Sequence, residues 1–237
     1  MKLVGLPLLF GALVLSARAD LTIVQKVEGT GSNNEMTMKL KGDKMRVDVG
    51  PQFTTIIDAK TGEMINLMND QKKVVRISGE KVRAAMEMAQ QFNSKSGKKE
   101  TNGKPNLIAT GKKETINSYE TEQYTWETPE FKATYWIAPK YPDGAAILKQ
   151  LQTINPDMWK TSNTRMPDYR EFPGLPIKTV LLIGGKQITT TLTVIKQDAL
   201  NDADFTIPKD YEEMKLPAMS SFLQQSATPP ATAPSPK

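Results

Sequence analysis

The chain has 237 residues, of which 38% are hydrophobic and 24% are charged, a balance that suits a folded protein with a substantial core. It contains no cysteine and no histidine, which excludes disulfides, an acylated cysteine anchor and any chemistry that needs histidine. The formal net charge of +5 is too small to indicate nucleic acid as a partner.

The first 19 residues predict a cleaved export signal. Lys2 precedes an apolar run from Leu3 to Leu15, which is too short to span a bilayer comfortably, and Ala17-Arg18-Ala19 offers small residues to a signal peptidase. Cleavage after Ala19 would leave 218 residues and lower the net charge to +3, because Lys2 and Arg18 are removed. We therefore expect a periplasmic or extracellular protein without a lipid anchor or a transmembrane segment.

Residues Glu35–Val49 predict a β-hairpin, because apolar and polar residues alternate on both sides of a two-residue turn at Gly42-Asp43. Its apolar residues would pair across the strands as Met36 with Val49, Met38 with Val47, and Leu40 with Met45. The charged side chains would share the opposite, solvated face: Lys39, Lys41, Lys44, Arg46 and Asp48.

A short meander and a helix follow the hairpin. Strands are expected at residues 53–58, 63–68 and 72–77. Ser78 suits the N-cap of a helix over residues 79–92. One apolar stripe runs along this helix: Val82, Ala85, Met86, Ala89 and Phe92. The polar residues Asn93–Lys104 are predicted to form a loop.

A second run of strands occupies the C-terminal half. The alternation predicts strands and one amphipathic helix, then an irregular proline-containing segment and two further strands around Gly184-Gly185, whose turn register stays open. The expected ranges are strands 107–116, 119–127 and 131–138, helix 143–154, irregular segment 155–176, and strands 177–183, 187–196 and 205–207. The domain is predicted to span residues 20–215, and residues 216–237 form a disordered tail rich in Pro, Ala and Ser.

These elements predict a mainly β (α+β) fold. About ten strands in meander order each carry one apolar face, and two helices carry the stripes that could cover it. We predict a single, strongly curved antiparallel sheet, a half-barrel, wrapped around one or two helices. A two-sheet sandwich is the alternative.

Several stretches, in their order along the chain, resemble an exported bacterial domain family of unknown function. They are Gly42–Asp48, Ile56–Met64, Tyr135–Ala138, Gly174–Pro176 and a closing Phe-x-x-Pro-x-x-Tyr segment within Asp204–Tyr211. That family is similar to the lipoprotein-carrier (LolA/LolB-like) superfamily, whose fold is an unclosed half-barrel with helices over an apolar cavity. The resemblance implies binding of acyl chains or another apolar ligand, and not catalysis.

Other chemistries have weaker signals. Serine–lysine pairs fall in the polar loop, where nothing would activate a lysine, and the carboxylates are scattered over solvated faces. Met36 and Met38 could offer thioethers to Cu(I), although their apolar face favours packing. Asn201–Asp204 lacks the glycine and the distant glutamate of a calcium loop and is interpreted as a turn. We expect no enzyme, no cofactor and no metal site.

We therefore predict an exported, non-enzymatic envelope protein that holds a lipid, an acyl chain or another apolar ligand in a cavity of the curved sheet. Ten apolar residues are predicted to line it: Met38, Leu40, Met45, Val47, Ile57, Met86, Tyr135, Ile137, Leu192 and Val194. The alternative is an interaction module with a filled core that binds an envelope protein or a cell-wall polymer. Copper binding through methionine ranks third.

Overall fold

The structure is a computed structural model that describes residues 20–29, 34–95, 106–128, 131–153, 167 and 169–214. The predicted export signal and tail lie outside these residues, as does much of the predicted loop and of the irregular segment. Within the described residues, no helix is long and apolar enough to cross a membrane.

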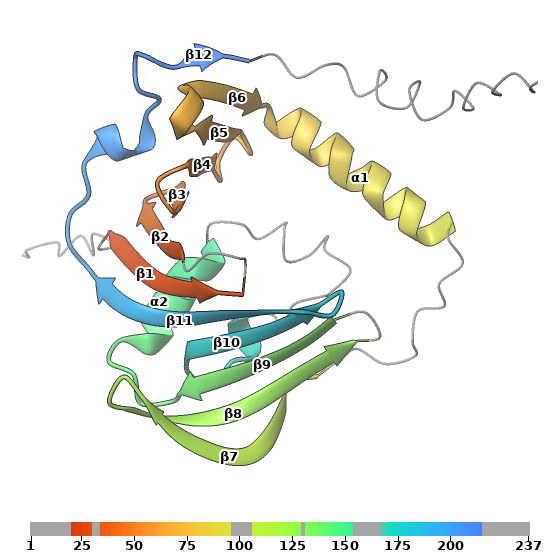
Figure 1. The fold of residues 1–237 in the computed structure, drawn as a ribbon, viewed down its shortest axis with the longest axis vertical. Helices are drawn as coiled ribbons and strands as arrows, with labels where there is room; N and C mark the ends of the chain where they lie inside the picture. Colours follow the sequence, from red (N-terminus) through yellow and green to blue (C-terminus); the bar gives the residue numbers. More distant parts are fainter. Residues whose placement is uncertain are drawn as a thin grey trace, which may run out of the picture.

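Twelve strands of the described chain form one open sheet (Figure 1). They are β1 (Leu21–Glu28), β2 (Asn34–Lys41), β3 (Lys44–Val49), β4 (Phe53–Asp58), β5 (Met64–Met68), β6 (Lys73–Ile77), β7 (Ile108–Ile116), β8 (Tyr119–Thr128), β9 (Phe131–Ala138), β10 (Leu175–Ile183), β11 (Lys186–Lys196) and β12 (Glu212–Glu213). The spatial order is β12-β6-β5-β4-β3-β2-β1-β11-β10-β9-β8-β7, so two meanders meet where β1 pairs with β11. The sandwich alternative is therefore wrong.

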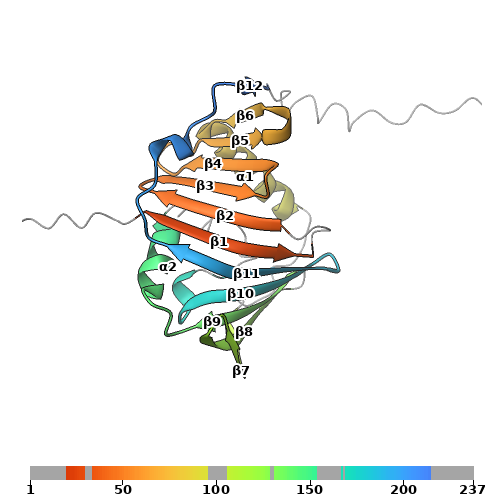
Figure 2. The same ribbon diagram turned by 60° about the vertical axis from the view of Figure 1, so that its left-hand side comes forward.

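The helices of the described residues are α1 (Gly79–Lys95) and α2 (Gly144–Thr153), with three short 3-10 turns, η1 (Asn69–Gln71), η2 (Tyr169–Glu171) and η3 (Asp202–Phe205). Figures 1 and 2 show a sheet that bends from β12 to β7, with α2 beside β1, β11 and β10. The expected N-cap of α1 is present, since the Ser78 hydroxyl accepts a hydrogen bond from the Lys81 backbone N–H at 3.4 Å. The prediction of a mainly β sheet with two helices is confirmed.

The predicted hairpin register is confirmed residue by residue. Met36 lies opposite Val49, Met38 opposite Val47, and Leu40 opposite Met45. The structure also determines the register of the last hairpin, which the sequence left undecided. Ile183 pairs with Lys186, so Gly184-Gly185 is the two-residue turn. Both glycines have positive φ, the conformation that such a tight turn requires.

Three features of the sheet differ from the prediction. Strand β1 was not predicted, although it is the strand that joins the two meanders. β12 runs parallel to β6, so the sheet is not purely antiparallel. Residues 205–207 do not form a strand: η3 ends at Phe205, because the Asn201 side chain accepts a hydrogen bond from Ala203 N and the Thr206 N–H closes the turn on Ala203 O.

The main core lies between α2 and the sheet. We call the sheet face that packs against α2 the inner face and the opposite one the outer face. The inner face of β1 and β9–β11 is covered by α2 and by Phe172, which follows η2. The largest contributors are fully or almost fully buried: Leu21, Leu40, Trp126, Tyr135, Ile137, Ile147 and Ile177. This half of the molecule therefore has a filled core.

A second, smaller core lies on the outer face. Residues 200–213, which we call the strap, leave β11 and cross the outer side of β2–β6, opposite α1 (Figure 1). Phe205 of the strap is buried against Ile56, Leu67 and Val74. β12, at the end of the strap, extends the sheet beyond β6. The strap thus covers apolar side chains that would otherwise face solvent.

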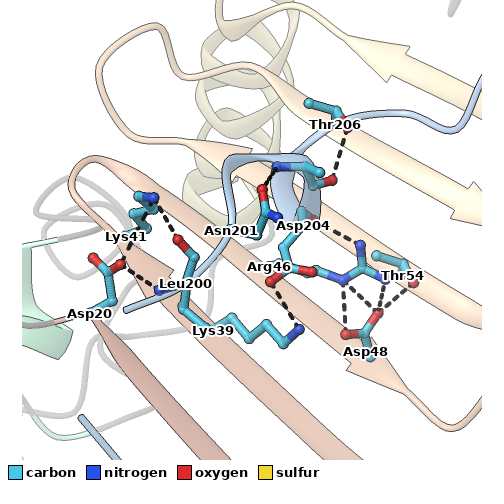
Figure 3. Close-up of polar contacts among 11 residues, drawn as sticks. Asp20, Lys39, Lys41, Arg46, Asp48, Thr54, Leu200, Asn201, Asp204 and Thr206 are labelled. Atoms are coloured by element: carbon cyan, nitrogen blue, oxygen red, sulfur yellow. Dashed lines mark hydrogen bonds and ion pairs between the residues drawn. The ribbon is translucent and has the colours of Figure 1, made fainter. Parts of the chain in front are cut away.

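The strap also changes the nature of the predicted solvated face (Figure 3). Lys39 and Arg46, like charges on paired residues, both meet Asp204: Lys39 Nζ lies 3.2 Å from its carboxylate and Arg46 Nη1 donates to its carbonyl at 2.8 Å. Lys41 pairs with Asp202 at 2.8 Å, a contact that lowers the pKa of the Asp202 carboxyl and raises the pKa of Lys41. The prediction that this face is simply solvated is wrong, because the strap supplies carboxylates and carbonyls to its cations.

Asp48 holds the centre of this polar layer. Its carboxylate accepts hydrogen bonds from Arg46 Nε at 2.9 Å and from the fully buried Thr54 hydroxyl at 2.6 Å. Charge-assisted contacts of this kind are the stronger class of hydrogen bond. The layer therefore fixes the registry of β3 and β4 beneath the strap.

Asp48→Ala is expected to lower the free energy of unfolding by about 2 kcal/mol, because it leaves a half-buried guanidinium without its carboxylate. Urea unfolding followed by circular dichroism measures the loss. The double variant Arg46→Met/Asp48→Ala should recover part of it, since no unpaired charge remains. Additive losses in the double variant would show that the two residues are not coupled.

Candidate ligand-binding face

The inner face of β2–β6 consists of three rows of side chains in register across the strands. The first row, at one end of the strands, is Met36, Val49, Phe53, Met68 and Lys73; the second is Met38, Val47, Thr55, Asn66 and Val75; the third is Leu40, Met45, Ile57, Met64 and Ile77. Because side chains alternate between the two faces of a strand, all fifteen point away from the strap. Twelve of them are aliphatic, methionine or aromatic, so the surface is predominantly apolar.

Exposure rises across these rows. In the third row, Leu40 is 1% exposed, and Ile57, two strands away, is also buried. In the first row, Val49 is 38% and Phe53 is 40% exposed. The face is therefore continuous with the main core at one side and open to solvent at the other. An open apolar surface of this kind is uncommon on a soluble protein without a binding role.

The structure gathers most of the predicted lining. Six of the ten residues lie in or against the main core cluster: Met38, Leu40, Met45, Tyr135, Ile137 and Leu192. Val47 and Ile57 lie in the rows beside them. Leu40, Tyr135, Ile137 and Leu192 are nearly fully buried and belong to the packed core, and of these four only Leu192 also borders a cavity, near the turn between β7 and β8. The side chain of Met86 lies outside the described residues.

Val194 was predicted to share a face with Leu192, and this prediction is wrong. A β-bulge in the pairing of β1 with β11 places Gln25 opposite Leu192 but Val24 opposite Val194. The extra residue shifts the alternation, so Leu192 is buried, Ile195 packs against the core and Val194 is 38% exposed. A bulge cannot be inferred from alternating hydrophobicity alone.

Sequence reasoning missed the residues that make the face open and partly polar. Val49, Phe53, Met68, Asn66 and Lys73 were not among the predicted lining residues. The alternation of β4 and β5 contained a signal for most of them, since Phe53, Thr55 and Ile57 must share one face. To place that face on the inner side of the sheet, one also has to know how four neighbouring strands pair, and the sequence alone does not show this.

Tyr135 is a buried member of the main core. Its ring packs edge-on against Phe172 at a centroid distance of 5.0 Å. Burial, with a smaller contribution from Tyr169, raises the pKa of the Tyr135 hydroxyl well above its ordinary value, so it stays protonated. Among the residues that the structure describes, the Tyr135 hydroxyl and the Trp126 indole N–H have no hydrogen-bond partner. Tyr135 and Trp126 therefore act as packing residues in the main core.

Two cavities adjoin the turn between β7 and β8. One, of about 340 Å³, is lined by Asn117, Tyr119, Tyr141, Ile177 and residues 192–195. A second one, of about 510 Å³ and with more charged residues in its lining, lies among residues 113–122 and 138–140, and the two share Tyr119. The Asn117 side chain donates a hydrogen bond to the Leu192 carbonyl, which ties this turn to β11. Tyr119 packs on Tyr141 with ring centroids 4.6 Å apart.

The fold and this face define a mainly β protein built on one open sheet with a partly exposed apolar inner surface. Residues 20–211 match the profile of a domain of unknown function, DUF4412, so the chain belongs to the DUF4412 family. No curated protein matches the sequence.

Among solved structures, the chain is similar to PNGF-II in a P21 crystal form, with 13% identity and a TM-score of 0.42 over 88% of this chain and 34% of that one. It thus spans about a third of the PNGF-II chain. It is also similar to the Mycobacterium tuberculosis lipoprotein LppX, with 12% identity and a TM-score of 0.35 over 77% of this chain and 88% of that one. At these scores, the function has to be argued from the site itself.

Proposed function

We propose that the protein is an exported, non-enzymatic envelope protein that binds an apolar ligand, a lipid or acyl chain, on the inner face of β2–β6. The observation that carries the proposal is the first row, where Val49 and Phe53 are 38% and 40% exposed between two methionines. Covering such a surface with an acyl chain removes apolar area of both partners from water. This burial contributes a favourable free energy of about 25 cal/mol per Å².

The composition of the face suits a flexible apolar ligand. Five of its fifteen side chains are methionine: Met36, Met38, Met45, Met64 and Met68. Methionine has three rotatable bonds and a polarisable sulfur, so it adapts to chains of different shape. A half-barrel curvature of the sheet, as the sequence resemblance implies, would let a ligand contact β2–β6 and the core-facing residues at once.

A filled-core interaction module is the second candidate. It is favoured by the half under α2, where Leu21, Ile137 and Ile147 are at most 1% exposed. Copper binding by methionine ranks behind both, because Met38 packs against the main core cluster. The first two candidates differ in one observable, an extractable apolar ligand.

Native mass spectrometry of the mature protein purified from its export compartment, followed by organic extraction, tests the proposal. A lipid-sized mass that is lost on extraction would support ligand binding. An unliganded protein that also fails to bind added acyl chains would contradict it and favour the interaction module. Purification without detergent keeps the result interpretable.

Phe53→Ser is expected to weaken binding of a fluorescent acyl-chain probe about fivefold to tenfold, because it removes a large apolar side chain from the open row. Stability should change little at a side chain that is 40% exposed. Leu182→Ser is the matched control, since Leu182 is 44% exposed on the outer face of β10. Equal effects of the two substitutions on probe binding would contradict the assignment of the face.

A further inference from the structure

We infer that the inner face of β2–β6 selects anionic amphiphiles, with Lys73 and Asn66 binding a carboxylate or phosphate head while the chain lies over the apolar first row. The inference rests on the proposed function and specifies its ligand. It is carried by the polar side chains of the second and first rows, which are set among apolar neighbours.

The first observation is a polar pair in the middle of the face. The Thr55 hydroxyl donates a hydrogen bond to the Asn66 side-chain oxygen at 2.9 Å. This contact orients the amide, because the oxygen is held by Thr55 and the NH₂ group is left to donate elsewhere. Within the described residues, that NH₂ group has no hydrogen-bond partner. Asn66 therefore presents donors, and no acceptor, to a ligand on this face.

The second observation is an unpaired ammonium group beside that amide. Lys73 lies opposite Met68 at the end of the first row, and Asn66 lies opposite Val75, so Lys73 and Asn66 are diagonal neighbours on one face. Lys73 is partly buried and makes no ion pair in the described part of the chain. Glu212, which the parallel pairing of β12 sets beside Lys73, does not reach it.

The neighbouring cations behave differently. Lys72 pairs with Asp210 at 2.9 Å, and Arg76, on the outer face, lies 3.4 Å from Glu63. Both belong to surface ion pairs, whereas Lys73 faces the apolar rows alone. A cation and amide donors at the border of an apolar surface complement an anionic head joined to an apolar chain. A neutral head would leave the ammonium unpaired, and a cationic head would be repelled.

The test compares three probes that share one chain and differ in head group: dodecanoate, dodecanol and dodecyltrimethylammonium, each below its critical micelle concentration. Calorimetry with the mature protein should show dodecanoate binding most tightly. Lys73→Met keeps the apolar stem and should weaken dodecanoate about tenfold while leaving dodecanol unchanged. Lys186→Met, at the exposed β10–β11 turn, is the matched control and should change nothing.

Asn66→Asp is a near-isosteric second variant that replaces the donor with a carboxylate. It should abolish the preference for dodecanoate and improve binding of the trimethylammonium probe. Acetate and inorganic phosphate, which carry no chain, should not compete with dodecanoate. Thermal unfolding of each variant, expected to resemble that of the parent, confirms that the sheet is intact.

The outcomes separate the inference from the proposed function. If no probe binds the parent protein, the proposed function fails. If all three bind equally well, or if Lys73→Met weakens all three alike, the face binds apolar chains and the anionic preference is overturned. Competition by acetate or phosphate as strong as that by dodecanoate would show a simple anion site, which also overturns it.

Discussion

Ile137→Asp is expected to remove most of the stability of the protein, whereas Phe53→Asp on the same sheet face is expected to be tolerated. Ile137 is 0% exposed and lies in the main core under α2. Burying a carboxylate there without a partner costs about 4 kcal/mol or more, a large share of the 5–15 kcal/mol that stabilises a typical domain. Phe53, being 40% exposed, leaves the new carboxylate in contact with water.

Urea unfolding followed by tryptophan fluorescence measures both losses, since Trp126 lies in the same core as Ile137. The expected order is a severe loss for Ile137→Asp and a loss of about 1 kcal/mol or less for Phe53→Asp. A comparable loss in both variants would mean that the first row is as enclosed as the core. In that case the inner face of β2–β6 would not be an open surface, and the proposed ligand site would have to be abandoned.

Local sequence patterns predicted the fold correctly where apolar and polar residues alternate along a strand and where a turn contains a residue suited to its backbone conformation. The hairpin around Gly42-Asp43 is the clearest example: six alternating residues and a glycine at positive φ determine the register of β2 and β3. Tyr135 and Ile137, two positions apart in β9, were likewise predicted to face inward, and both are buried. These predictions depend on neighbours in sequence, so they needed no knowledge of the tertiary structure.

Several features that the sequence analysis did not predict depend on contacts between segments that are distant in sequence. β1 was overlooked beside the export signal, although Leu21, Ile23 and Val27 are its buried residues. The strap could not be foreseen, because its ion pairs join Asp202 and Asp204 to lysines about 160 positions earlier. The bulge opposite Val24 moved Val194 out of the predicted lining. The strap and the bulge depend on tertiary pairing, whereas the alternation of β1 was present in the sequence and was missed.

The same limit applies to the candidate site. The sequence placed Met38, Met45, Val47 and Ile57 on one apolar face, and the structure brings them together. It could not show that one half of that face is filled by α2 while the other half is open. Whether a part of the face is filled depends on which strands a helix covers. The hydrophobic periodicity of the sequence does not contain this information. The polar residues Asn66 and Lys73 acquire a role only after the rows are known.

Phe205→Ala is expected to detach the strap from the outer face. Phe205 is 5% exposed and is the strap residue buried against Ile56, Leu67 and Val74. Removing a buried phenylalanine side chain costs about 3–5 kcal/mol when the surroundings cannot collapse. The remaining contacts of the strap are the partly buried Leu200, Ile207 and Tyr211, hydrogen bonds, and ion pairs that contribute roughly 0–1 kcal/mol each. The strap should therefore open locally before the sheet unfolds.

Hydrogen exchange at the end of the strap reports this opening. The Glu212 N–H donates to the Lys72 carbonyl at 2.9 Å, and the Met214 N–H donates to the Val74 carbonyl at 2.7 Å. Both amides should lose protection in Phe205→Ala, while amides of β1 and β9 keep theirs. Asp202→Asn, which removes only the ion pair of a 90% exposed carboxylate with Lys41, is the control and should leave both amides protected. Protected Glu212 and Met214 amides in Phe205→Ala would show that contacts other than that of Phe205 hold the strap to the outer face.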